Sequence, residues 1–146
     1  MENKLDITSL KNAANAFYMA IAFADRVEAK PSDKRDVYEF ETAHAALIKH
    51  FEFCYELCWK TMRRFIQIED IGKEADILTR KDLFRVAAEK RLIADFDHWL
   101  AYHDARNKTS HVYDFKVADN VYQTAKMFAG DLREFVETME IIEKRI

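Results

Sequence analysis

Residues 105–114, with the sequence ARNKTSHVYD, hold side chains that can act on a phosphate. Arg106 carries a planar guanidinium that matches phosphate oxygens with two hydrogen bonds. His111, five residues later, can gain or lose a proton near neutral pH. Together they suit RNA cleavage without a metal. In that reaction the histidine accepts the proton of a ribose 2′-hydroxyl and the arginine stabilises the charge that develops on phosphorus.

The same residues also have simpler interpretations. An arginine and a histidine near the end of a helix often cap backbone carbonyls or pair with a carboxylate. On a continuous helix, His103, Asn107 and His111 would share a face, because they are four residues apart. Such a set would be a poor transition-metal site, since asparagine is a weak ligand for these ions. We therefore expect neither a metal nor a cofactor.

The composition indicates one ordinary domain, residues 1–146, with a packed core, because 49% of the 146 residues are apolar. Only two glycines and one proline occur, which disfavours folds rich in hairpins. The net charge of −3 argues against a large, sequence-independent surface for nucleic acid. A local basic cleft stays possible, and its candidate residues are Arg63, Arg64, Arg106 and Lys108.

Two cysteines, Cys54 and Cys58, lie four residues apart in a helical pattern and are expected to be reduced core residues. The sequence has no apolar run typical of a signal peptide and none long enough to span a membrane. We expect a cytoplasmic protein.

Apolar residues recur at steps of three and four over most of the chain, and no strand-like alternation competes with them. The pattern predicts a first helix that ends near Lys30, because Pro31 restricts the residue before it. A second, long helix runs from about Val37 and stops before Gly72, and its apolar arc is wide enough to be buried on two sides. The second side faces either a crowded core or another subunit. Two shorter helices and a last helix over residues 117–142 follow, so the sequence predicts an all-α, up-and-down bundle of four to five helices.

Polar residues ahead of these helices predict their caps. Asp6 or Thr8 would cap the first helix, and residues 31–33 would supply the cap of the second. Thr79 with Asp82 resembles a capping box, and Asp95 can cap the helix that leads to Arg106.

Two stretches resemble a known family. RNKTSHVYD is similar to the signature of the nucleotidyltransferase substrate-binding proteins, which belong to the HEPN superfamily. FEFCYELCWKT, residues 51–61, resembles the aromatic-Glu-aromatic and Glu-Leu-x-Trp-Lys-Thr pattern of that family's second helix. The order of elements fits from about Leu5 to Ile142, which is nearly the whole chain.

This resemblance implies a HEPN-like helical bundle, commonly a homodimer, that works with a separate, minimal nucleotidyltransferase encoded nearby. The pair would form a two-component system of the toxin–antitoxin kind. The chain would be its substrate- or nucleotide-binding subunit, with Arg106, Asn107, His111 and Tyr113 as the binding residues. Whether such a subunit is itself an enzyme stays open on this resemblance.

The wider superfamily implies an alternative. There, the pattern R-x-x-x-x-H marks metal-independent ribonucleases whose site forms at a dimer cleft, and Arg106 and His111 match it as catalytic residues. Some members extend the pattern to R-x-x-x-x-H-x-Y, and the partner enzyme silences them by attaching AMP to the tyrosine. Tyr113 stands at that position. The chain would then be a ribonuclease toxin with RNA as its ligand.

Glu52 and Glu56 lie on one face of the second helix and have two interpretations. Solvated ion pairing is the first, because Glu56 and Lys60 are a favourable helical pair. In the second, Glu52 or Glu56 turns inward and orients Arg106 or His111, since a buried acid is normally paired. Trp59 is expected in the core or at an interface.

Overall fold

The computed structural model describes residues 4–34, 36–70 and 78–146. Within these ranges, five α-helices and two short 3-10 helices form, and no strand occurs. They are, in chain order, α1 (Thr8–Ala29), η1 (Ser32–Lys34), α2 (Val37–Glu69), α3 (Arg80–Glu89), α4 (Phe96–Asn107), η3 (Thr109–His111) and α5 (Phe115–Arg145). The all-α class expected from the periodicity is confirmed.

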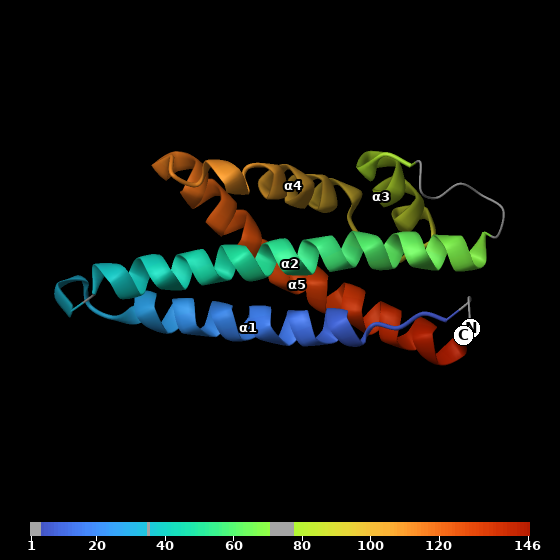
Figure 1. The fold of residues 1–146 in the computed structure, drawn as a ribbon, viewed down its shortest axis with the longest axis horizontal. Coiled ribbons are helices and arrows are strands. Elements are labelled where there is room, and N and C mark those ends of the chain that lie inside the picture. The colour runs from blue at the N-terminus through green and yellow to red at the C-terminus, as the bar shows by residue number, and fades with distance from the viewer. Residues whose placement is uncertain (1–3, 35, 71–77) are drawn as a thin grey trace.

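The long helices α1 and α2 form an antiparallel hairpin, and α5 crosses behind it (Figure 1). Helices α3 and α4 lie along α2 on the side away from α1, and α4 leads back to the upper end of α5. The segment that leads into α1 lies beside the opposite end of α5, where the N–H of Ile7 donates to the carboxylate of Glu143 at 3.2 Å. This arrangement puts the connection between α4 and α5, which carries most of the predicted site, at an outer corner of the bundle.

Four helices begin with an aspartate or threonine that accepts hydrogen bonds from the first turn. Thr79 Oγ1 accepts from the backbone N–H of Asp82 at 3.1 Å, and Asp95 does the same for His98 at 3.0 Å. Both caps were expected from the sequence. Asp114 caps α5 through the N–H groups of residues 116 and 117, at 2.9 and 3.3 Å. These caps satisfy backbone donors that a helix start leaves unpaired.

Two other predicted caps are wrong. The N-cap residue of α1 is Ile7, whose side chain has no hydrogen-bond acceptor. Asp6 stands one residue before the cap position, and its carboxylate accepts from the N–H of Thr8 at 2.9 Å. Residues 31–33 do not cap α2, because the chain first makes the η1 turn. Asp36 supplies the cap instead, accepting from the N–H of Tyr38 at 2.8 Å. The predicted stop before Gly72 lies outside the described residues.

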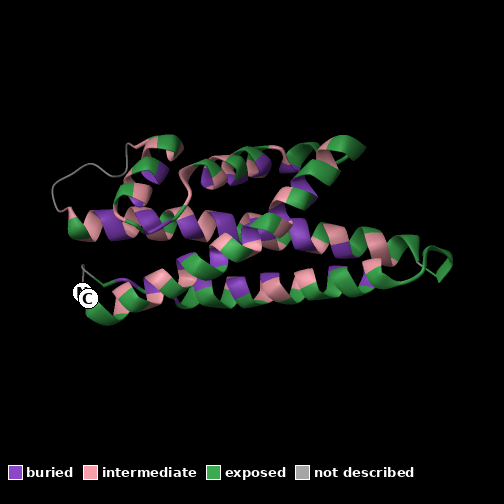
Figure 2. Cartoon of the chain, turned by 180° about the vertical axis from the view of Figure 1, so that it is seen from behind, coloured by how far each residue is buried: buried purple, intermediate pink, exposed green. Residues whose placement is uncertain are grey.

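The centre of the core is a group of aromatic rings from four helices. Phe128 of α5 contacts Phe17, Phe51, Trp99 and Tyr102, with ring centroids 4.9–5.8 Å apart. All five side chains are buried, and Figure 2 shows buried residues along the inward faces of the helices. Edge-to-face geometry adds to the burial energy of such rings. Phe128 therefore joins α1, α2 and α4 to α5.

The wide apolar arc of α2 is covered by the chain itself, since α2 packs against α1, α3, α4 and α5. Cys54 and Cys58 lie inside this arc, buried and free. Burial raises the pKa of Cys54 to about 12 and that of Cys58 well above its ordinary value. Both stay protonated and unreactive, as their core placement requires.

Candidate functional site

The corner between α4 and α5 is built from the last turn of α4, the η3 turn and the cap of α5. Arg106 and Asn107 end α4, and Thr109 closes it by donating from its hydroxyl to the carbonyl of Arg106 at 2.8 Å. The same hydroxyl accepts from Nη1 of Arg106 at 3.2 Å. One threonine thus ends the helix and fixes one arm of the guanidinium.

Glu56 of α2 holds the other side of Arg106. Its Oε1 lies 3.3 Å from Nε of Arg106, while its Oε2 accepts from the indole N–H of Trp59 at 2.9 Å. The Arg106 Nε–H is not aligned for a hydrogen bond, so the contact is an ion pair. With the carboxylate and Thr109 as anchors, the guanidinium is oriented, and 34% of the side chain stays exposed. Of the two interpretations of the α2 acids, the Glu56 contact matches the one in which an acid turns inward and orients Arg106.

Glu52 is placed differently. Its carboxylate lies 3.6 Å from the ammonium of Lys49 on the same helix, and its side chain is 18% exposed. Within the described part of the chain, Glu52 has no contact with Arg106 or His111. Of the two candidate supporting acids, only Glu56 touches the predicted site.

His111 and Tyr113 lie beyond the end of α4 and face solvent. Their rings pack edge-to-face, with centroids 6.0 Å apart, and Tyr113 is 84% exposed. In residues 4–34, 36–70 and 78–146, no hydrogen bond or ion pair involves the His111 imidazole. The structure therefore brings together Arg106 with Glu56 and His111 with Tyr113. These two groups are neighbours along the chain and share the corner, but the imidazole does not contact the guanidinium.

A second histidine, His103, joins the site from one turn earlier on α4. Its Nε2 lies 3.4 Å from Nδ2 of Asn107, and its Nδ1 lies 2.7 Å from the hydroxyl of Tyr55 on α2. Burial lowers the pKa of His103, and the positive charge of Arg80 adds to this. The imidazole is therefore neutral at pH 7 and positions Asn107 beside Arg106. The sequence showed only that His103 and Asn107 share a face.

The sequence matches the family described as nucleotidyltransferase substrate binding protein like over residues 5–141. The chain belongs to this family. It is 37% identical over 127 residues to the probable ribonuclease HepT of Haemophilus influenzae, and the match covers 84% of this chain and 83% of that protein. It also resembles a solved structure from Haemophilus influenzae, described as the fold of a substrate-binding domain of a nucleotidyltransferase. That likeness has a TM-score of 0.79 at 32% identity and covers 92% of this chain and 99% of the other.

The family match covers all the site residues considered so far, from Lys49 on α2 to Tyr113. In this member of the nucleotidyltransferase substrate-binding family, no described helix is both long and apolar enough to cross a membrane. Nor do three His, Cys, Asp or Glu side chains come together as possible metal ligands in the described ranges.

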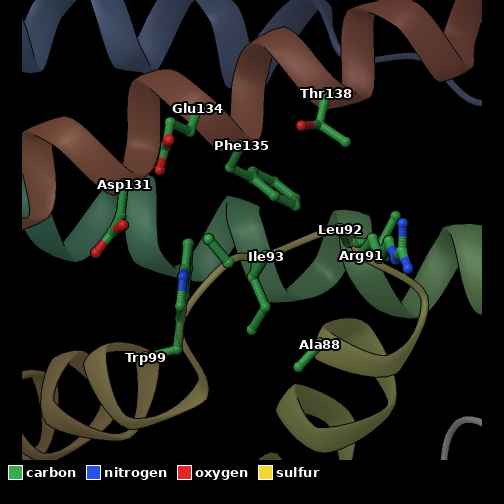
Figure 3. Close-up of a pocket in the computed structure, with 10 residues that line it drawn as sticks. Ala88, Arg91, Leu92, Ile93, Trp99, Asp131, Glu134, Phe135 and Thr138 are labelled. Atoms are coloured by element: carbon green, nitrogen blue, oxygen red, sulfur yellow. The ribbon is translucent and has the colours of Figure 1, made fainter.

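A cavity of about 350 Å³ lies away from this corner, between the start of α4, the α3–α4 connection and α5 (Figure 3). Trp99 and Phe135 form part of its apolar wall, Asp131 and Glu134 bring carboxylates from α5, and Arg91 lies at the other end. Two carboxylates on one wall repel a phosphate. None of the residues predicted for the site lines this cavity.

The neutral state of His103 predicts how stability depends on pH. Because its folded-state pKa is below the unfolded value of about 6.5, its contribution is complete above that pH and is lost as the pH falls towards the folded-state pKa. We expect the urea midpoint to fall between pH 7 and 5, and to fall less in His103→Gln.

His98 provides a control of opposite sign. The hydrogen bond that its ring N–H donates to the Asp131 carboxylate raises the pKa of His98, so its contribution is present below about pH 6.5 and is lost as the pH rises through the folded-state value. In His98→Gln, the urea midpoint should therefore fall more steeply than in the wild type as the pH is lowered. An unchanged profile in His103→Gln would contradict the neutral, Tyr55-bonded imidazole.

Proposed function

We propose that this chain is the substrate- or nucleotide-binding subunit of a two-component system, in which a separate small nucleotidyltransferase, encoded nearby, carries out nucleotide transfer. The observation that supports this most is the Arg106 guanidinium, held by Glu56 and Thr109 at an exposed corner beside Asn107. A guanidinium whose orientation is fixed before binding loses little conformational entropy when it meets a phosphate.

The exposed end of the corner fits this role. Tyr113 and His111 offer a phenol and an imidazole to solvent within a few residues of Arg106. A nucleotide phosphate on Arg106 would thus be open to an approaching partner enzyme rather than enclosed by the chain. The subunit would act as a homodimer in a toxin–antitoxin-like pair, as the family resemblance implies.

Co-purification of the two gene products tests the proposal. The complex should form, and calorimetric titration should show that it binds ATP more tightly than the nucleotidyltransferase alone. Arg106→Gln should remove the gain in affinity while leaving the complex intact, because Arg106 is assigned to the nucleotide and not to the partner. If mixing changes neither assembly nor affinity, the binding role is excluded.

A second candidate is a metal-independent ribonuclease, favoured by the similarity to a relative named as a probable ribonuclease. His111, exposed on η3, would take the proton of the 2′-hydroxyl. The freed oxygen then bonds to phosphorus, and the bond from phosphorus to the 5′-oxygen breaks as that oxygen gains a proton. Arg106 would neutralise the charge on the phosphoryl oxygens. The reaction leaves a cyclic 2′,3′-phosphate and a 5′-hydroxyl end.

Tyr113 is the candidate site at which the partner would silence such an activity. Its hydroxyl would attack the α-phosphorus of ATP, forming a tyrosyl–AMP bond as pyrophosphate leaves and the phenol proton passes to solvent. Incubation with the nucleotidyltransferase and ATP should add the mass of one AMP to the wild-type chain and none to Tyr113→Phe.

The matched control for this reaction is Tyr38→Phe. Tyr38 on α2 is 81% exposed, nearly as much as Tyr113, but lies far from η3 along the chain. Intact-protein mass spectrometry should show Tyr38→Phe modified like the wild type. AMP on Tyr113→Phe, or an unmodified wild-type chain, would count against the assignment.

A further inference from the structure

The cavity of about 350 Å³ beside α5 has no part in the function proposed above. The α5 residues that line it recur at steps of three and four and so share one face of the helix; they are Asp131, Glu134, Phe135 and Thr138. The first and the last are seven positions apart, which gives the cavity a length of about 10 Å along α5. Its volume lies at the small end of the range for pockets that hold a small molecule, about 300–1,000 Å³.

The two ends of this cavity carry opposite charges. Asp131 and Glu134 bring carboxylates to one end, and the guanidinium of Arg91 lies at the other (Figure 3). The Asp131 carboxylate is oriented, because it accepts hydrogen bonds from Nδ1 of His98, at 2.9 Å, and from the hydroxyl of Tyr102. In the part of the chain that the structure describes, no hydrogen bond or ion pair involves the carboxylate of Glu134 or the guanidinium of Arg91. The charges of Glu134 and Arg91 are therefore both available to a ligand.

Apolar side chains form the wall between the charged ends. Ile93 comes from the α3–α4 connection, Trp99 from the first turn of α4 and Phe135 from α5, and all three are buried. The indole N–H of Trp99 donates to no acceptor among the described residues, although this residue is only 1% exposed. A buried indole N–H usually has a hydrogen-bond partner. The wall thus suits a ligand that has an apolar body and carries a hydrogen-bond acceptor.

Arg91 occupies a backbone position that favours glycine. It follows the last turn of α3 with a φ of 62°, in the left-handed region. Its N–H donates to the carbonyl of Ala88 at 3.1 Å, and the N–H of Leu92 donates to that of Ala87 at 2.9 Å, which closes the end of the helix. Glycine adopts this conformation without the steric cost that a side chain brings. The arginine therefore makes the end of α3 less stable than glycine would, and it places a cation at the cavity.

We propose that this cavity binds a short peptide of two or three residues with both termini free. Its N-terminal ammonium lies against Glu134 and Asp131, and its C-terminal carboxylate meets Arg91. Its first carbonyl accepts from the indole N–H of Trp99. An extended chain spans about 3.3–3.6 Å per residue, so three residues match the cavity length of about 10 Å. A ligand with a charge of only one sign would be repelled at one end of the cavity.

The test is nuclear magnetic resonance of the full, isotope-labelled chain during titration with trialanine. The sequence has two tryptophans, which report on separate places, since Trp99 lines the cavity and Trp59 bonds Glu56 at the Arg106 corner. Trialanine should shift the indole N–H signal of Trp99 until it saturates and leave that of Trp59 in place. N-acetyl-trialanine lacks the ammonium and trialanine amide lacks the carboxylate. Each should bind about tenfold more weakly, as expected for one lost hydrogen bond to a charged group.

Arg91→Gly separates binding from folding. It should bind trialanine about tenfold more weakly than the wild type, and no better than it binds trialanine amide. The same variant should have a higher urea midpoint, because glycine removes the steric cost at this φ. A residue that only supports the fold would not give a more stable chain with lower affinity.

Glu134→Gln should also bind trialanine about tenfold more weakly, and it should no longer distinguish trialanine from its N-acetyl form. Glu137→Gln is the matched control. Glu137 is another exposed acid of α5, but it does not line the cavity. This variant should bind trialanine like the wild type.

Several results would overturn the peptide site. They are an unmoved Trp99 signal, a shift of the Trp59 signal alone, or unchanged affinity in both Arg91→Gly and Glu134→Gln. The probe 8-aminooctanoate carries both charges at the spacing found in trialanine but has no peptide carbonyl, so equal affinity for this probe would also overturn the assignment. The inference does not depend on the proposed function, since loss of AMP binding in Arg106→Gln should leave trialanine binding unchanged.

Discussion

His111→Ala is expected to reduce RNA cleavage by the partner-free chain by about 10²- to 10⁴-fold, the usual contribution of a general base. Arg106→Ala should have an effect of similar size, because its guanidinium is the group fixed by Glu56 and Thr109 for a developing negative charge. The double variant should be little worse than either single one, since both act in one step. The measurement is the rate of cleavage of a single-stranded RNA in the presence of EDTA.

His50→Ala is the control for this experiment. His50 is a partly exposed histidine of α2 that packs on Phe53, with ring centroids 6.4 Å apart, and has no assigned role. Its loss should leave the rate unchanged. Intact RNA after incubation with the wild-type chain would remove the ribonuclease candidate and leave the binding subunit as the function.

Phe128→Ala should lower the free energy of unfolding by about 3–5 kcal/mol, the range for removing a large buried aromatic side chain. The effect should reach this range because the Phe128 ring touches Phe17, Phe51, Trp99 and Tyr102, which come from three other helices. No single neighbour can move to fill the space without leaving its own partners. Urea denaturation followed by circular dichroism gives the measurement.

Phe115→Ala is the matched control, since this residue begins α5 and its side chain is 91% exposed. Its effect should stay within about 0.5 kcal/mol, as for most surface substitutions. A loss below about 1 kcal/mol in Phe128→Ala would show that the four-helix contact at this ring does not stabilise the fold as described.

The helices and several of their caps were predictable because they depend on local sequence. Thr79 and Asp95 each stand directly before an amphipathic segment, so their roles follow from position alone. The start of α2 was not predictable in the same way, because Ser32, Asp33 and Asp36 are all suitable caps. The η1 turn between them decides which one precedes a continuous helix.

The composition of the site was predictable in part, and its internal contacts much less. Arg106 and His111 were grouped by spacing, but α4 ends at Asn107, and the His111 ring packs against Tyr113 instead of contacting Arg106. Whether Glu52 or Glu56 meets Arg106 depends on where α4 crosses α2. The apolar pattern of one helix carries no information about such a crossing. The cavity beside α5 is bounded by residues of α3, α4 and α5, and it gave no signal in the sequence for the same reason.

The central claim is that a phosphate-bearing ligand binds at the corner formed by Arg106, His111 and Tyr113. Backbone amide and indole N–H chemical shifts of the isotope-labelled chain, followed during titration with AMP, test this without any substitution. The account predicts that the largest shifts fall in residues 106–113 and at the indole N–H of Trp59. Shifts confined to the cavity around Asp131, or no shifts at all, would contradict it.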